Sequence, residues 1–353
     1  MALPSPSASV EAQAKEAYGA VRDRLRDGKA RIFEERVFAS EAALKAIRPL
    51  RKEILGDLDD GVPPVELVAP ASAAGAVAGV HVHAVRCDAK PLPVRHHDAP
   101  CGRILRGKDL TWITLLGLAA PGAGNACDQA RKNFETAAAI LRDAKTDMRS
   151  VVRTWLWLGD ILAWYGDFNR VRTTFFHEQG LLNCHPGKAL LPASTGIGLK
   201  PAGTALCGLD LIAAVGKEGL TEYLQAAGHQ RSAFHYGSAF SRAATTQMPA
   251  GKTVFVSGTA AIDPSGKTAF VGDAEGQIRS TVENVRAVLA DGKCADSEVV
   301  HALAYCKTPE VEKVWQKLAA DVPWPCITVL GDICRDDLLF EIEATGCPGA
   351  RGA

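Results

Sequence analysis

Apolar positions divide most of the chain into two stretches that share one order of predicted elements. Each stretch opens with an apolar, β-branched run that ends in glycine, at residues 110–117 and 252–258, and such runs are typical of core strands. Apolar side chains then recur every three or four positions over residues 130–141 and 278–289, which predicts amphipathic helices. In each stretch a second strand, a second helix and a closing strand follow, at residues 151–158, 164–176 and 209–213, and again at residues 299–305, 309–318 and 340–344.

This repeated order predicts an α+β fold of two tandem units, each with a mixed sheet and helices on one of its faces. The first unit is expected over residues 101–220. The second is expected over residues 221–353, with a further strand at the hairpin of residues 262–266. Short strand-like runs broken by Pro and Ala-Gly precede the units, so residues 1–100 are expected to form an N-terminal extension packed on the first unit.

The composition excludes several classes of function. The chain has 353 residues, of which 47% are hydrophobic, 40 are basic and 40 are acidic. Without an excess of positive charge there is no electrostatic basis for nucleic-acid binding, and no apolar run approaches the roughly 20 residues of a membrane span. The cysteines show no metal-ligand spacing and the N-terminus has no apolar leader segment, so we expect a cytosolic protein without a metal or a cofactor.

Several segments resemble the RidA/YjgF family of small imine deaminases. In the second stretch they are Gly251-Lys-Thr-Val-Phe-Val-Ser-Gly258, Ile262-Asp-Pro-Ser-Gly266, Val282-Glu-Asn-Val-Arg-Ala-Val-Leu289 and Phe340-Glu-Ile-Glu-Ala344. In the first stretch they are Val152-Arg-Thr-Trp155 and Phe168-Asn-Arg-Val-Arg-Thr-Thr-Phe-Phe176. The resemblance covers most of residues 105–346 and implies two tandem RidA/YjgF-like (chorismate mutase-like) units.

Two such units fused in one chain resemble the chorismatase family, whose members are chorismate hydrolases and hydroxybenzoate synthases. The segments that carry this resemblance are residues 102–108, 155–169, 191–198 and 239–243. The resemblance implies a metal-free pocket between the two units that binds chorismate and releases pyruvate from it.

One departure from the RidA pattern bears on the substrate. RidA deaminases bind their substrate carboxylate with an arginine two residues after a proline, but here Ile327 follows Pro325 and Ser194 follows Pro192. An imine deaminase is therefore the alternative enzyme, and a non-catalytic metabolite-binding protein is the alternative outside the enzymes.

The closing strand of the second stretch carries the candidate catalytic acid. Glu341 and Glu343 are two residues apart and so share one face of the strand. Release of pyruvate from chorismate needs a proton on the methylene carbon of an enol ether, and a carboxyl group that burial keeps protonated can supply it. The resemblance assigns this role to Glu341. The closing strand of the first stretch has only Asp210, so a single active site is expected.

The resemblance also bears on the product. Cys334 matches the chorismatases that form hydroxybenzoate, where a cysteine helps to open a strained ring intermediate. Ala243 is a second position expected to vary with the product, and it does not clearly agree with Cys334. We expect 3-hydroxybenzoate, with 4-hydroxybenzoate or a dihydroxycyclohexadiene carboxylate as alternatives.

Further residues are candidates for binding the substrate. Arginines suit its two carboxylates, and since Arg170 and Arg172 lie two apart on a helix, at most one of them is expected to face the pocket. The complete set of candidates is Arg242, Arg172, Arg153, Tyr165, Asn169, Tyr236, Ala243, Gly196 and Ser257. Two units in one chain can form internally the kind of interface that RidA trimers form between subunits, so we expect a monomer.

Overall fold

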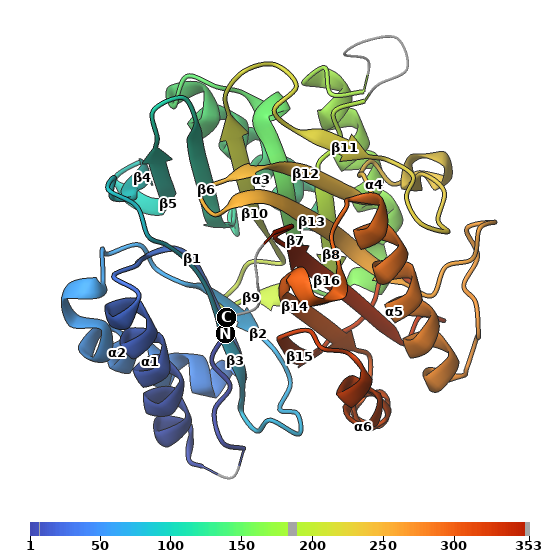
Figure 1. Cartoon of the computed structure of the whole chain (residues 1–353), viewed down its shortest axis with the longest axis horizontal. Helices are drawn as coiled ribbons and strands as arrows, with labels where there is room; N and C mark the ends of the chain where they lie inside the picture. The colour runs from blue at the N-terminus through green and yellow to red at the C-terminus, as the bar shows by residue number, and fades with distance from the viewer. Residues whose placement is uncertain (7, 183–188, 350–353) are drawn as a thin grey trace.

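In the computed structural model, which describes residues 1–6, 8–182 and 189–349, the strands form three sheets that surround a shared apolar core (Figure 1). The shared core contains Phe33 from one sheet, Trp157 from the second and Tyr305 from the third. The helices lie outside the sheets and cover further apolar clusters, one for each sheet.

The first unit is a mixed sheet with the strand order β4-β5-β6-β10-β7-β8. In that order its strands are Leu92–His96, Ala99–Arg106, Thr111–Leu118, Cys207–Val215, Val151–Leu158 and Ala193–Ile197. Helices α3 (Ala126–Asp143) and α4 (Ile161–Glu178) pack on its outer face. Asn125 and Asp128 form a capping box that starts α3, since each side chain accepts a hydrogen bond from the backbone of the other.

The second unit repeats this arrangement, with the strand order β11-β12-β13-β16-β14-β15. In that order its strands are Glu222–Leu224, Ala243–Met248, Gly251–Ala260, Phe340–Gly346, Val299–Cys306 and Cys326–Leu330. Helices α5 (Ala274–Asp291) and α6 (Pro309–Leu318) cover its outer face. The internal repeat and the α+β class predicted from the sequence are confirmed.

The N-terminal sheet forms a third layer, with the strand order β3-β1-β2-β9. Its strands are Val77–Val85, Arg31–Ala39, Val65–Val68 and Lys200–Pro201, and its helices are α1 (Val10–Asp27) and α2 (Glu41–Leu55). It was expected to pack on the first unit, but it contacts both units. Arg36 binds Asp210 of the first unit, and the ring of His81 lies 4.2 Å from that of His301 in the second.

The structure corrects the prediction at residues 262–266. Strand β13 ends at Ala260, and the hairpin is a turn in which Asp263 accepts hydrogen bonds from Ser265 and from the backbone of Lys267. The sequence pattern also missed β12 and β15. Both are short and flanked by Gly, Ser or Pro, so they lack a clear apolar period. Within the described residues, no helix is long and apolar enough to cross a membrane.

Gly102 provides a test of the β5–β6 pairing. It faces Leu115, and a β-carbon added to it would lie 1.9 Å from the carbonyl oxygen of Thr114. Because that oxygen belongs to a paired strand, we expect Gly102→Ala to lower the free energy of unfolding by about 3 kcal/mol. Gly19→Ala, in α1 with open space around it, is the matched control and should raise stability by about 0.5–1 kcal/mol. Urea unfolding measures both, and an unchanged Gly102→Ala protein would contradict this pairing.

Candidate active site

The two units are joined by hydrogen bonds between β8 and β13. The backbone N–H of Ser194 donates to the Ser257 hydroxyl at 2.8 Å, and the N–H of Gly258 donates to the Thr195 hydroxyl at 3.0 Å. These bonds hold the inner faces of the two sheets at a fixed separation, and a cavity opens beside them.

This cavity has a volume of about 190 Å³ and receives side chains from both units. Helix α4 and strand β8 contribute from the first unit, and β13, β16 and the loop before β16 contribute from the second. Its lining residues are Tyr165, Asn169, Arg172, Ser194, Gly196, Ser238, Phe240, Arg242, Gly258, Ala260, Ile262, Cys334, Arg335, Leu338 and Glu341.

Glu341 lies on β16 with only 4% of its surface exposed, and its carboxyl group extends over Gly258. A β-carbon on residue 258 would lie 2.1 Å from Oε1 of Glu341. A glycine at this position is therefore what allows the carboxyl group to reach the cavity.

Burial is the main cause that raises the pKa of Glu341 to about 8, and the nearby charge of Glu343 raises it further. Arg153 and Arg242 oppose the shift only in part. Glu341 is therefore predominantly a protonated acid at neutral pH, which is the state that a general acid needs.

Glu343 lies deeper and is bound by two donors from the first unit. Its Oε1 accepts a hydrogen bond from the indole N–H of Trp155 at 2.7 Å, and its Oε2 accepts one from Arg153 at 3.0 Å. Arg153 also donates to Thr195 at 2.6 Å. The two glutamates thus share a strand face, as the sequence predicts, but they differ in surroundings.

Two buried guanidinium groups line the cavity. Arg172, from α4, donates to Asn169 at 2.6 Å, and Arg242 donates to the carbonyl oxygen of Arg231 at 3.1 Å. Both lie near the ring of Phe240, at 5.5 Å and 5.6 Å from its centroid. Arg170 instead points outward and pairs with Asp167, so only one of the two helix arginines faces the cavity, as predicted.

Cys334 and Tyr165 lie together on another part of the cavity wall. Burial raises the pKa of the Cys334 thiol to about 12, with the nearby Glu341 as a second cause. Burial, and then Cys334, also raises the pKa of Tyr165. Both groups are therefore protonated at neutral pH and can donate hydrogen bonds, but neither is an anionic nucleophile.

The structure brings most of the sequence-predicted site residues together. The residues that line the cavity are Glu341, Cys334, Arg242, Arg172, Tyr165, Asn169 and Gly196. The structure places Arg153 and Ser257 behind the wall, where they bind other protein groups, and Ala243 is fully buried on β12. The side chain of Tyr236 lies outside the described residues.

Sequence reasoning missed Arg335, Ser238 and the glycine at position 258. Arg335 adjoins Cys334, and Ser238 lies two residues after Tyr236, so the available signal was their closeness in sequence to predicted site residues. The role of Gly258 depends on contact with a residue 83 positions later and has no local signal.

The strand register explains why one unit has the acid and the other does not. Asp210 faces Trp155 on β7, and Glu343 faces Leu303 at the equivalent position of β14. Asp210 is thus the counterpart of Glu343, and Gly208 is the counterpart of Glu341. The first unit therefore has no side chain at the position of the acid.

The described residues also bear on whether the protein binds a metal ion. Among them, no group of three or more His, Cys, Asp or Glu side chains is arranged to bind a metal ion.

Comparisons with known proteins agree with this architecture. A family model described as Endoribonuclease L-PSP matches residues 231–347, and no curated protein sequence matches the chain. A chorismatase crystal structure is similar over 82% of this chain and 88% of its own, with a TM-score of 0.61 and 21% identity. YyfA, a Rid-family protein of unknown function from Yersinia pestis, is 20% identical over 36% of this chain and 98% of its own (TM-score 0.31). The YjgF gene product of E. coli is 17% identical over 35% of this chain and 98% of its own (TM-score 0.28).

The chain therefore shares the fold of the chorismatase structure, and its second unit matches the Endoribonuclease L-PSP family model. The resemblance to the chorismatases that the sequence indicates is confirmed for the fold.

The raised pKa of Glu341 predicts a pH-dependent effect on stability. The folded protein binds this proton more tightly than the unfolded chain, whose ordinary value is 4.5, so stability declines as pH rises from there through about 8. Glu341→Gln removes the decline, and its melting temperature should rise relative to wild type between pH 5 and pH 9 by a few degrees. The control is Glu283→Gln, on the exposed face of α5, which should show no such trend. A constant difference between Glu341→Gln and wild type across this range would contradict the assignment.

Proposed function

We propose that the protein is a chorismatase that releases pyruvate from chorismate, with Glu341 as the general acid. The observation that carries the proposal is a buried carboxyl group, that of Glu341, which faces a cavity lined by two buried guanidinium groups and whose pKa burial raises to about 8. The chorismatase-like fold supports it, because the cavity lies between the two units.

In the proposed reaction Glu341 transfers its proton to the methylene carbon of the enol ether. The carbon–carbon double bond supplies the electron pair, and an oxocarbenium ion forms at the ether carbon. Water can attack this ether carbon, and the resulting hemiketal releases pyruvate when its bond to the ring oxygen breaks. Alternatively, the neighbouring ring hydroxyl attacks the ring carbon that bears the ether oxygen. The bond from that ring carbon to the ether oxygen then breaks, its electron pair restores the carbonyl group of pyruvate, and a strained epoxide remains on the ring. A proton returns to Glu341 when the attacking oxygen loses its hydrogen.

Arg172 and Arg242 are the proposed partners of the two substrate carboxylates. Each is at least 98% buried, so a charged hydrogen bond there is screened little by water. Tyr165 and Asn169 lie on the same wall as Arg172 and supply polar groups for the ring hydroxyl and the ether oxygen. Arg153 contributes indirectly through Glu343.

We propose 3-hydroxybenzoate as the main product, because the Cys334 thiol lies on the cavity wall close to Glu341. When the ring hydroxyl attacks, a strained ring intermediate forms, and a neutral thiol can donate or accept a proton while that ring opens. Ala243 lies behind the wall, so any influence it has on the product is transmitted through its neighbours.

An assay of pyruvate from purified protein and chorismate tests the reaction. We expect turnover by the wild type, and a loss of at least about 100-fold in Glu341→Gln, which retains the shape of the side chain but has no acidic proton. Glu283→Gln serves as the control with full activity. A wild-type protein that releases no pyruvate above background would refute the proposal, and ammonia from 2-iminobutyrate would instead identify a deaminase.

Separation of the products tests the role of Cys334. We expect Cys334→Ala to keep pyruvate release within about tenfold of wild type, since proton transfer to carbon comes first. The share of hydroxybenzoate should fall and that of the dihydroxycyclohexadiene carboxylate should rise. Cys101→Ala, a thiol in the first unit away from the cavity, is the control. An unchanged product ratio in Cys334→Ala would exclude the thiol from the second step.

A further inference from the structure

The carboxyl groups of Glu341 and Glu343 differ in the number of hydrogen bonds that they accept. Glu343 accepts from Trp155 and from Arg153, whereas Glu341 makes no side-chain hydrogen bond within the described part of the chain. Charging two neighbouring buried carboxyl groups together is unfavourable, so the pair retains one proton. Donors stabilise the charged form, so this proton stays on Glu341.

The indole of Trp155 is fixed by two guanidinium groups. The Cζ atom of Arg36 lies 3.8 Å from the ring centroid, and that of Arg153 lies 4.6 Å from it. Arg36 belongs to β1 of the N-terminal sheet and is itself anchored by Asp210 and Glu34, each at 2.9 Å. A chain of contacts therefore leads from the N-terminal sheet to Glu343.

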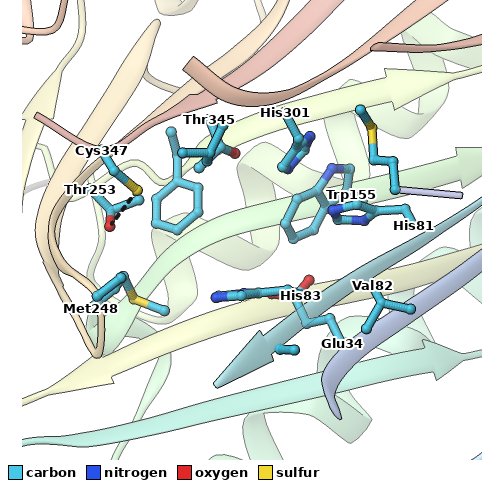
Figure 2. A pocket seen from close by; sticks show the side chains of 15 residues that line it. Glu34, His81, Val82, His83, Trp155, Met248, Thr253, His301, Thr345 and Cys347 are labelled. Carbon is cyan, nitrogen blue, oxygen red and sulfur yellow. Dashed lines mark hydrogen bonds and ion pairs between the residues drawn. The ribbon is translucent and has the colours of Figure 1, made fainter. Parts of the chain in front are cut away.

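The indole of Trp155 is buried, but it is not enclosed by packed side chains on every side. Trp155 borders a second cavity of about 240 Å³, between the N-terminal sheet and the second unit. Figure 2 shows Trp155 at this cavity beside His81 and His301, with Glu34 next to His83. The guanidinium contacts and the hydrogen bond to Glu343 therefore act together with the core packing to orient the ring.

We propose that Trp155 is a positioning residue for the catalytic carboxyl pair, and that Arg36 of the N-terminal sheet holds Trp155 in place. This proposal concerns the same site as the proposed chorismatase function and rests on that function. The indole N–H keeps Glu343 negatively charged and leaves the transferable proton on Glu341. When that proton moves to the substrate, the negative Glu343 stabilises the oxocarbenium ion.

Trp155→Phe tests this by removing the N–H while keeping an aromatic ring for the two arginines. The low-pH side of the rate profile reports the pH below which the carboxyl pair takes up a second proton. Loss of one hydrogen bond to a charged group should move this limb up by about one pH unit. A limb that coincides with that of the wild type would overturn the proposal.

Trp157→Phe is the matched control on the same strand. The indole N–H of Trp157 donates to Asp210 at 3.0 Å. Asp210 is the counterpart of Glu343 in the first unit, where Gly208 stands in place of Glu341. Trp157→Phe should lose a similar amount of stability without any shift of the limb. An equal shift in both variants would reduce the effect to a general loss of packing and overturn the proposal.

Arg36→Lys tests the part played by the N-terminal sheet. Lysine retains a positive charge for Glu34 and Asp210 but not the flat surface that stacks on an indole. We expect a smaller shift of the limb in the same direction as in Trp155→Phe. An unshifted limb would overturn the role assigned to Arg36.

Infrared titration separates this proposal from the proposed function, because it needs no turnover. As the pH is lowered, the carbonyl band of a second protonated carboxyl should appear about one unit higher in Trp155→Phe than in wild type. If the wild type releases no pyruvate but the band shifts, the chorismatase function fails while the coupling of Trp155 to the carboxyl pair stands. If the wild type is active but the band of Trp155→Phe is not shifted, the coupling of Trp155 to the carboxyl pair is refuted while the chorismatase function stands.

Discussion

The structure depends on charged side chains from three sheets that are buried together and paired. Arg36 of the N-terminal sheet binds Glu34 and Asp210, and Arg153 of the first unit binds Glu343 of the second. Each of these five residues is at most 1% exposed. Removing one partner of such a pair typically costs about 3–5 kcal/mol, because a charge is left buried alone. The pairs therefore restrict how the sheets are placed relative to one another. Within the described residues, Glu341 has no cation paired with it directly.

The two units use the same strand register for different purposes. Asp210 and Glu343 are equivalent, and both are saturated with donors, Asp210 by Arg36, Trp157 and the backbone of Gly117. The difference lies two residues earlier, where the first unit has Gly208. A β-carbon there would lie 2.8 Å from the ring of Pro201, on a strand that belongs to the N-terminal sheet. In the first unit, strand β9 thus lies close to the position where a catalytic side chain would need space.

The sequence was informative where a pattern is local and less so where a contact is distant. The helices and central strands follow from apolar periods, and α6 and β7 have the predicted bounds. That Glu341 and Glu343 share a strand face also follows from their spacing. The different surroundings of the two glutamates could not be predicted, because Trp155 reaches Glu343 across the seam between the units and Gly258 adjoins Glu341 from the neighbouring strand of its own sheet. Arg153 was expected to bind substrate, but an arginine looks the same in sequence whether its partner is a substrate or a buried glutamate.

The charge balance of the cavity suits the proposed acid. Substrate carboxylates brought near Glu341 would raise its pKa further and make it a weaker acid, since like charges disfavour ionisation. Arg172 and Arg242 offset this, because they lie on the cavity wall where those carboxylates would bind. Glu343 has the opposite effect to the arginines, because its charge raises the pKa of Glu341. The proton therefore stays on Glu341 until the enol carbon is close enough to accept it. An acid with a pKa of about 8 is then protonated in the resting enzyme and is still strong enough to protonate carbon. A more isolated carboxyl group in a fully apolar cavity would have a higher pKa and would be too weak an acid.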